Sequence, residues 1–281
     1  MISFKLYREY GALNSPPVFD AFQTGVLHTG NTIVDKNEDV AVIWSVLWQG
    51  RMRGNLPIYQ ARTSANTPTI IIEVGNFIRG KTWRVSIHNV NRLGYFGNTT
   101  NLDYNRPSKL GVHLKDHVAK TNSEILITGQ HENSLQWSGQ PTTAVWVASL
   151  ISRLRHYTDR PIKFRPHPRA NISVQNLLIE QPKKIAGTYD DYDINYNYHC
   201  VINHNSGPTV QSAINGTPVI CDPSGLAFPV SDIIANIETP RLLDRSGWLI
   251  ELCHTEWTVD EIASGIPLQR LIPTINSYLT S

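Results

Sequence analysis

The sequence predicts an α/β protein built from two doubly wound domains in tandem. Short apolar runs alternate with amphipathic stretches along most of the 281 residues, which is the pattern of parallel strands covered by helices. A hydrophobic content of 41% is enough to give each domain a core. A polar tract rich in Gly and Asn, residues 89–109, interrupts the alternation before a second series begins. We therefore expect domains at 1–118 and 119–265, and a C-terminal helix at 266–281 that packs back on the first domain.

The individual elements follow from the hydrophobic period and from the turn residues that bound it. In the first domain we expect strands at 2–7, 40–45, 69–74 and 83–88, and helices at 15–30 and 56–64. In the second we expect strands at 124–128, 161–165, 183–186, 200–203 and 218–221, and helices at 142–157, 190–198 and 207–215. Helices are also expected within 242–252, 259–263 and 268–279.

Composition excludes several classes of protein. No apolar run approaches the roughly 20 residues that a membrane span needs, and the first residues lack the shape of a signal peptide. We expect a cytoplasmic monomer. The three cysteines, Cys200, Cys221 and Cys253, are odd in number and widely spaced, which argues against a disulfide framework and against a zinc site.

The two halves of the chain differ in charge. Residues 1–120 hold 14 Lys or Arg and 8 Asp or Glu, whereas the remainder holds 11 and 15. This difference fits either ordinary scatter of surface charge or a polyanionic acceptor bound by the first half.

A possible phosphate site lies where the strand at 200–203 meets the helix at 207–215. Asn205, Ser206, Gly207 and Thr209 form the turn between them, and Asn203 and His204 precede it. The amides and the positive dipole end of a helix N-terminus suit a diphosphate, and Gly207 allows close approach of the backbone. The same residues also fit an ordinary capped helix, so the turn alone does not decide between the two.

Two further loops follow strands of the same predicted sheet. Arg165, His167 and Arg169 alternate with prolines after one strand, and a rigid loop of this kind can direct its cations at one anion. Gln130 follows another strand in a Gly-Gln turn. Ligands of open α/β sheets bind at such carboxyl ends. Tyr189, Asp190 and Asp191 follow a third strand, where they are either ribose contacts or, with Thr188, capping residues of the next helix.

Together these motifs resemble the GT-B glycosyltransferases, particularly the capsule-type enzymes. His204-Asn205-Ser206 and Gly216 to Val219 are similar to their donor-site motif, and Arg165 to Pro168 resembles their Arg-Pro-His-Pro element. The resemblance implies two Rossmann-like domains facing each other across a cleft. It also implies a nucleotide-diphosphate sugar as donor, with UDP preferred, no bound cofactor and no metal. The usual helix glutamate is absent, since Gln211 and Ser212 occupy that region.

In such an enzyme the first domain would hold the acceptor and the catalytic base. Arg51, Arg53 and Arg79 lie on cationic loops that could bind acceptor phosphates. Glu73, at the end of a predicted strand, is the preferred base, because direct displacement needs a group that removes the acceptor hydroxyl proton. Asp20 is the second candidate. His28 and Asp103 remain alternatives.

The order of motifs along the chain also resembles glycosyltransferases of tailed phages. That resemblance implies hydroxymethylated cytosine in double-stranded DNA as the acceptor and a role in DNA modification. Three alternatives stay open: a capsule or surface-polysaccharide transferase of the same fold, a non-catalytic nucleotide- or DNA-binding α/β protein, and a sugar-nucleotide epimerase.

Overall fold

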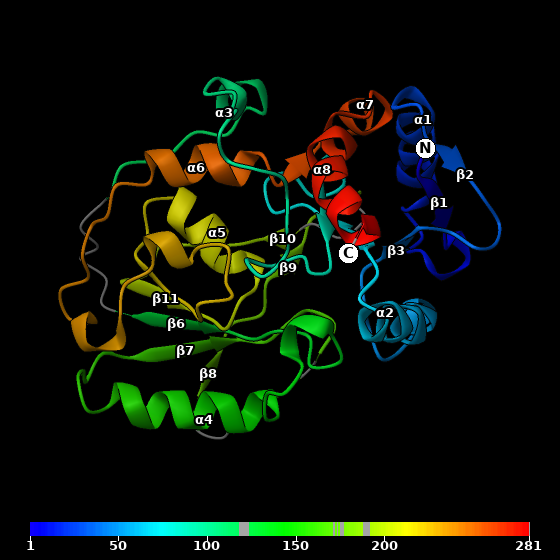
Figure 1. The fold of residues 1–281 in the computed structure, drawn as a ribbon. Helices are drawn as coiled ribbons and strands as arrows, with labels where there is room; N and C mark the ends of the chain where they lie inside the picture. Colours follow the sequence, from blue (N-terminus) through cyan, green and yellow to red (C-terminus); the bar gives the residue numbers. More distant parts are fainter. Residues whose placement is uncertain (118–123, 171, 173, 175–176, 188–191, 281) are drawn as a thin grey trace. The chain divides into compact units, whose positions relative to one another are not determined.

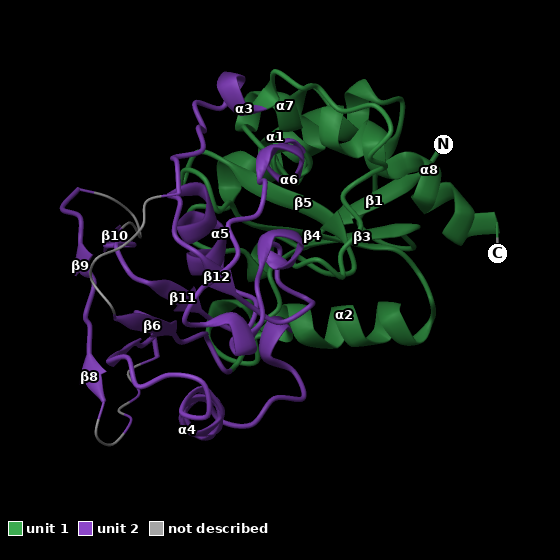
Figure 2. Cartoon of the chain, turned by 90° about the vertical axis from the view of Figure 1, so that its left-hand side faces the viewer, with its two compact units in different colours: residues 1–106, 133–135, 251–281 green, residues 107–132, 136–250 purple. Residues whose placement is uncertain are grey.

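The computed structural model describes residues 1–117, 124–170, 172, 174, 177–187 and 192–280. The chain forms two compact units (Figure 2). Unit 1 comprises residues 1–106, 133–135 and 251–281, and unit 2 comprises residues 107–132 and 136–250. Unit 1 therefore contains both ends of the chain. The division into domains at residues 118 and 265 stays a prediction.

Unit 1 is built on a six-stranded mixed sheet. Its strands, in sheet order, are β13 (Glu256–Trp257), β5 (Trp83–Ile87), β4 (Thr69–Val74), β3 (Val40–Trp44), β1 (Ser3–Leu6) and β2 (Thr32–Ile33). The strands β1 to β4 pair in parallel, whereas β5 runs antiparallel to both β4 and β13. The four strands expected in this part are confirmed. The sequence did not indicate β2 and β13, which have two residues each.

Helices cover both faces of this sheet. The helices α1 (Pro16–His28), α7 (Val259–Ala263) and α8 (Ile266–Thr280) pack on one face, and α2 (Asn55–Ser64) packs on the other. Neighbouring strand residues alternate between the two cores: Trp44 and Ile72 face the α1 side, and Ile43 and Ile71 face the α2 side. The tail of the chain therefore completes the core of unit 1.

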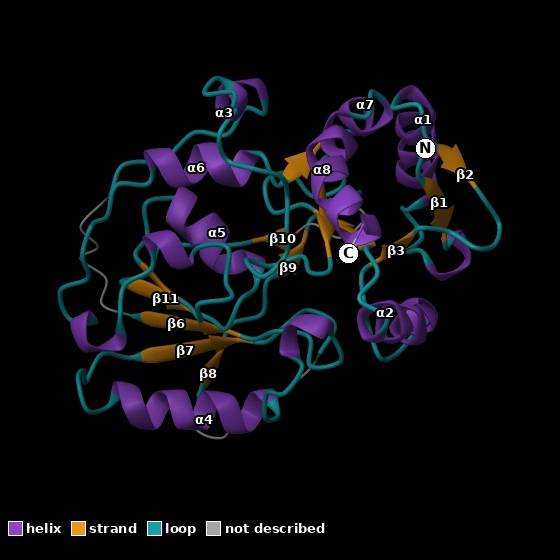
Figure 3. Cartoon of the chain, viewed as in Figure 1, coloured by secondary structure: helices purple, strands orange, loops and turns teal. Residues whose placement is uncertain are grey.

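Unit 2 contains a five-stranded, fully parallel sheet. Its order is β12 (Val219–Ile220), β11 (Cys200–Ile202), β6 (Ile125–Thr128), β7 (Ile162–Arg165) and β8 (Leu178–Ile179). The helix α4 (Thr143–Leu154) covers one face and α5 (Gly207–Ile214) the other (Figure 3). All carboxyl ends of the strands meet at one edge of this sheet.

The expected helix at 190–198 is wrong for residues 192–198, the part that the structure describes. Tyr192–Asp193 is instead strand β10, which pairs antiparallel with β9 (Lys183–Lys184), so the expected strand at 183–186 forms a small ribbon. Asn, Asp and Tyr are poor helix formers, and the register sets Asp193 opposite Lys183. Tyr189, Asp190 and Asp191, with Thr188, lie outside the described residues.

The remaining elements are short. The helices α3 (Arg106–Lys109) and α6 (Ser246–Cys253) are visible in Figure 1. Single 3-10 turns occur at Arg8–Tyr10, Arg51–Gly54, Leu135–Trp137, Phe228–Val230 and Ile234–Asn236. Within the described ranges, none of the helices has the length and apolar character needed to cross a membrane.

Candidate functional site

The polar residues expected at a donor site gather at the carboxyl edge of the unit 2 sheet. Gln130 follows β6, Arg165 ends β7 and precedes His167 and Arg169, and Asn205 follows β11. These strands are neighbours in the sheet, with β11 next to β6 and β6 next to β7. Parallel pairing thus brings together loops that are separated by 35 to 75 positions in the sequence.

Gln130 and Asn205 bind each other. The Gln130 side-chain amide donates to Asn205 Oδ1 at 2.7 Å, and the Asn205 backbone N–H donates to Gln130 Oε1 at 3.3 Å. The Asn205 amide also donates to the Gln136 carbonyl and to the Ser224 hydroxyl. Both side chains are buried. These hydrogen bonds therefore hold the loop after β6 against the loop after β11.

The turn before α5 is held by its own side chains. The Asn203 amide donates to the carbonyl and hydroxyl oxygens of Ser206, at 3.0 and 2.9 Å. The buried Thr209 hydroxyl lies within hydrogen-bond distance of Asn203 Oδ1 and of the Ser206 carbonyl. Within this fully described turn the Ser206 side chain makes no capping bond, and the helix begins at Gly207. The first amides of α5 thus keep the unpaired donors that any helix N-terminus presents.

Arg165 is buried, with 3% of its surface exposed. Its Nη2 donates to Glu180 Oε1 at 2.9 Å and to the Asn195 carbonyl at 2.7 Å. Its Nε and Nη1 have no partner among the described residues. A buried guanidinium normally has all of its N–H groups bonded, so these two nitrogens can still donate to an acceptor that is not among the described residues.

Two imidazoles follow the neighbouring strands β6 and β7. His131 and His167 meet edge to face, with ring centroids 5.4 Å apart. The Arg169 backbone N–H donates to His167 Nδ1 at 3.1 Å, so a neutral His167 carries its proton on Nε2. Burial and the Arg169 charge lower the pKa of His131, while Glu132 opposes them. His131 was not among the residues expected at the site, although it directly follows Gln130.

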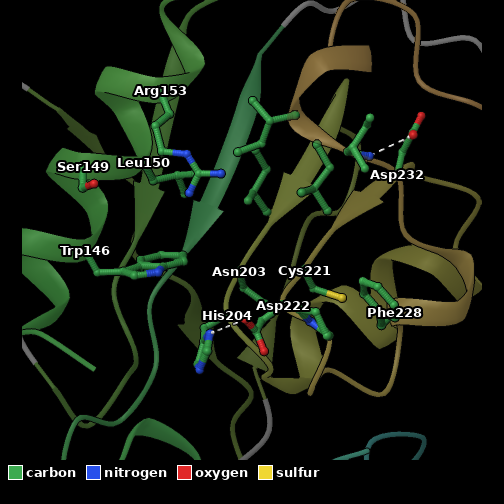
Figure 4. A pocket seen from close by; sticks show the side chains of 15 residues that line it. Trp146, Ser149, Leu150, Arg153, Asn203, His204, Cys221, Asp222, Phe228 and Asp232 are labelled. Carbon is green, nitrogen blue, oxygen red and sulfur yellow. Dashed lines mark hydrogen bonds and ion pairs between the residues drawn. The ribbon is translucent and has the colours of Figure 1, made fainter. Parts of the chain in front are cut away.

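A cavity of about 310 Å³ opens on the α4 side of the same sheet (Figure 4). Its floor includes Ile202 and Ile220, and its walls include Trp146 and Phe228. None of the predicted donor-binding side chains lines it. Residues of the turn after β11, Asn203 and His204, do line it, so the cavity and the donor motif meet there.

His204 sits at this meeting point. Its Nδ1 is 3.9 Å from Asp222 Oδ2, and its ring packs edge to face against Trp137 and Trp146, with centroids 5.3 and 6.5 Å away. Burial lowers the pKa of His204, and Asp222 opposes the shift. His204 is therefore kept in its neutral form more than an exposed histidine would be.

The candidate catalytic residues of unit 1 occupy different elements. Glu73 lies on β4 and accepts a bond from the Val74 N–H at 2.8 Å. Asp20 lies on α1, where its exposed carboxylate pairs with Arg8 at 2.6 Å. Of the alternatives, Nδ1 of His28 bonds the Ala263 carbonyl, and Oδ1 of Asp103 accepts from the Asn105 N–H.

The predicted acceptor residues are exposed. Arg51 and Arg53 lie in the 3-10 turn before α2, and Arg79 lies in the loop after β4. Arg84, on β5, is internal: its guanidinium donates to the carbonyls of Val74 and Val90. In the part of the chain that is described, no cluster of three or more His, Cys, Asp or Glu could hold a metal ion.

No protein-family model matches the sequence, and no curated protein sequence matches it. Among solved structures, the KpsC beta Kdo 2,7 transferase of Thermosulfurimonas dismutans aligns over 97% of this chain and 100% of its own, with a TM-score of 0.53 and 12% identity. The KpsC beta Kdo 2,4 transferase of the same organism aligns over 99% and 98%, with a TM-score of 0.52 and 10% identity. The chain therefore has the GT-B-like α/β fold of these transferases.

Proposed function

We propose that the chain is a glycosyltransferase that moves a sugar from a nucleotide sugar to a hydroxyl of a saccharide acceptor. The observation that carries the proposal is the edge of the unit 2 sheet. There the loop after β7 carries His167 and Arg169 beyond a buried arginine, Arg165, whose Nε and Nη1 have no partner among the described residues, and the N-terminus of α5 lies on the same edge. This is the chemistry of an anion site. A GT-B-like fold over almost the whole chain supports the same assignment.

The edge suits the phosphate of the donor. In the reaction, the bond from the anomeric carbon to the phosphate oxygen breaks, and its electron pair leaves with the nucleotide. The leaving oxygen gains negative charge, which fixed cations and helix amides stabilise without reorganisation. In this proposal Arg165 and Arg169 supply the cations, and the first amides of α5 supply neutral donors.

The acceptor step is assigned to unit 1. A new bond forms between the acceptor oxygen and the anomeric carbon, and the hydroxyl proton passes to a carboxylate. Glu73 is the proposed base. Asp20 is less suited because its carboxylate already pairs with Arg8. The acceptor contacts are proposed at Arg51, Arg53 and Arg79, which are exposed.

A saccharide acceptor is favoured over DNA by what the cations of unit 1 already bind. Arg8 pairs with Asp20, and Arg106 pairs with Glu261. Arg62 donates to the carbonyls of Glu38 and Asp39, and Arg84 to those of Val74 and Val90. These four cations serve the unit itself. The positive excess counted in the sequence is therefore weaker support for a polyanion than its size suggests, because phosphate binding needs free cations.

The test is a matrix of donors and acceptors followed by mass spectrometry. The donors are UDP-sugars and a nucleotide-activated Kdo, the sugar in the names of the similar structures. The acceptors are Kdo-containing oligosaccharides, hydroxymethylcytosine DNA and water. We expect a mass increase on the oligosaccharide with one donor. Transfer to the DNA base alone would mean that the acceptor is DNA and not a saccharide. Conversion of the donor without any acceptor would identify an epimerase, and binding without turnover would identify a binding protein.

A further inference from the structure

Glu256 is a fully buried carboxylate that no step above uses. It lies on β13, about 180 residues after the loop that follows β4, and it binds that loop. Oε1 accepts the Asn76 N–H at 2.5 Å, and Oε2 accepts the Phe77 N–H at 3.2 Å. Oε2 also accepts the Thr82 hydroxyl at 2.9 Å. One carboxylate thus holds three donors between the ends of β4 and β5.

The backbone of the loop is built around this carboxylate. Gly75 lies so close that a methyl group on it would overlap Glu256 Oε2 and the Thr82 hydroxyl. The Gly75 N–H donates to the Thr82 carbonyl at 2.9 Å, which closes the loop at its base. Only glycine leaves room for this approach. The loop 75–77 is therefore shaped by a residue from the far end of the chain.

Glu256 also belongs to a row of charges that includes Glu73. Arg84 on β5 is directly opposite Glu73 on β4 and directly opposite Glu256 on β13. Residues opposite one another in antiparallel pairs share one face of a sheet. Burial lowers the pKa of Arg84, the charges of Glu73 and Glu256 oppose this, and Arg79 adds to it. Arg84 thus lies opposite two acids, and the charges of both favour its protonated form.

We propose that Glu256 is a positioning residue for acceptor activation: it fixes the loop 75–77 beside Glu73 and shares the charge of Arg84 with it. This inference rests on the proposed function, in which Glu73 is the base. A glutamine at this position could not accept the same three hydrogen bonds. Glutamine offers one acceptor oxygen, and its amide would set an N–H against a loop N–H or the Thr82 hydroxyl, which leaves a buried donor without a partner.

The test compares Glu256→Gln with Glu261→Gln. Both change an acid of the same C-terminal segment, but the carboxylate of Glu261 pairs with Arg106, whereas that of Glu256 binds the loop 75–77. Glu261→Gln therefore controls for loss of stability in unit 1. We expect Glu256→Gln to lower kcat by about tenfold to a hundredfold, the scale of a displacement of about 1 Å, with little change in the KM of the donor. Glu261→Gln should keep kcat within about threefold, because a destabilised but folded enzyme keeps its site.

The split between kcat and KM separates positioning from a purely structural role. A displaced loop beside Glu73 should lower kcat at saturating acceptor, whereas the KM of the donor should stay close to the wild-type value. An equal loss through kcat and through the donor KM would reduce Glu256 to a structural residue and overturn the proposal.

Amide hydrogen exchange and a second variant cover the case in which Glu256→Gln folds poorly. Gly75→Ala keeps every charge but displaces the carboxylate, so it should lower kcat and expose the amides of Asn76 and Phe77 to exchange. Unchanged exchange and unchanged kcat in Gly75→Ala would overturn the proposal. If the wild-type protein transfers no sugar to any acceptor, the proposed function fails and the role in acceptor activation falls with it. Slow exchange at Asn76 and Phe77 would then show only that the loop is held.

Discussion

Two buried arginines, each followed by proline, differ in how many of their guanidinium nitrogens donate hydrogen bonds. Arg106 in unit 1 and Arg165 in unit 2 are 5% and 3% exposed, and each pairs with a glutamate. In Arg106, Nε, Nη1 and Nη2 all donate, to Glu261 and to the carbonyls of Cys253 and Glu256. In Arg165, only Nη2 does so among the described residues. The two arginines are thus alike in burial and in pairing with a glutamate, and they differ in how many of their nitrogens have a partner among the described residues.

The surroundings of the two arginines strengthen the difference. The Arg106 guanidinium lies 4.0 Å from the centre of the Trp257 ring, which closes its remaining side. The Arg165 guanidinium is 5.7 Å from the Tyr196 ring, and Glu180 also accepts the Tyr198 hydroxyl. Burial and this hydrogen bond raise the pKa of Tyr198. Glu180 and the Tyr196 ring thus lie against Arg165, and its Nε and Nη1 have no partner among the described residues.

The largest effect is expected when Arg106 is removed. Arg106→Met should lower the free energy of unfolding of unit 1 by about 3–5 kcal/mol, because it leaves Glu261 and two carbonyls without their donor. Urea denaturation followed by Trp fluorescence would measure it. Nucleotide binding by the folded variant should be unchanged. A loss below about 1 kcal/mol would mean that Arg106 contributes no more than an exposed arginine.

For Arg165, we expect substitution to weaken nucleotide binding more than it lowers the stability of unit 2. Arg165→Lys keeps a cation beside Glu180 but loses the planar fork, so nucleoside-diphosphate binding should weaken by about tenfold to a hundredfold, the value of one or two charge-assisted hydrogen bonds. Binding of the bare nucleoside should change little. Titration calorimetry with both ligands measures the difference. The control is Arg160→Ala, which removes a more exposed pair with Glu238 in the same unit. Equal losses for nucleoside and diphosphate would show that Arg165 does not hold the phosphate.

The partner of Arg106 gives a pH-dependent effect of intermediate size. Burial alone would raise the pKa of Glu261, but its bonds with Arg106 and Thr258 outweigh burial and lower it. A carboxyl with a lowered folded-state pKa stabilises the fold above its unfolded pKa, and this contribution is lost as the pH falls through the folded value. Glu261→Gln should therefore cost about 1–2 kcal/mol at pH 7, the scale of a charge-assisted bond. Its unfolding free energy should approach that of the wild type below about pH 4. A constant difference across this range would contradict the assignment.

Much of the fold was readable from the sequence because its strands are apolar runs between turn residues. The runs at β3 and β4 are fully or largely buried, and their predicted bounds differ from the observed ones by at most one residue. β13 was not readable because it has two residues, one of which is the charged Glu256. A buried charge in a strand becomes intelligible only when its partners are known.

The polar residues also divide into those that the sequence could indicate and those that it could not. Arg165, His167 and Asn205 could be picked out because each follows a strand of one parallel sheet, so local pattern is enough to gather them. Arg106 could not be assigned a role, because its partner Glu261 lies 155 positions away in the sequence. It lies in the polar tract, residues 89–109, that interrupts the alternation of apolar and amphipathic stretches. Local motifs predicted which residues follow the strands of one sheet, and long-range contacts determine which of their N–H groups have a partner.

The smallest effect is expected for an arginine that is exposed. Arg8 pairs with Asp20 at 2.6 Å, as closely as the buried pairs, but the two side chains are 37% and 70% exposed. Solvent screens such a pair, and two side chains lose freedom to form it, so Arg8→Ala should change the free energy of unfolding by no more than about 0.5 kcal/mol. Urea denaturation at low and high salt would measure both the loss and its screening. A loss comparable to that of Arg106→Met would mean that contact distance, and not burial, sets the strength of these pairs; a small, salt-sensitive loss assigns the difference to burial.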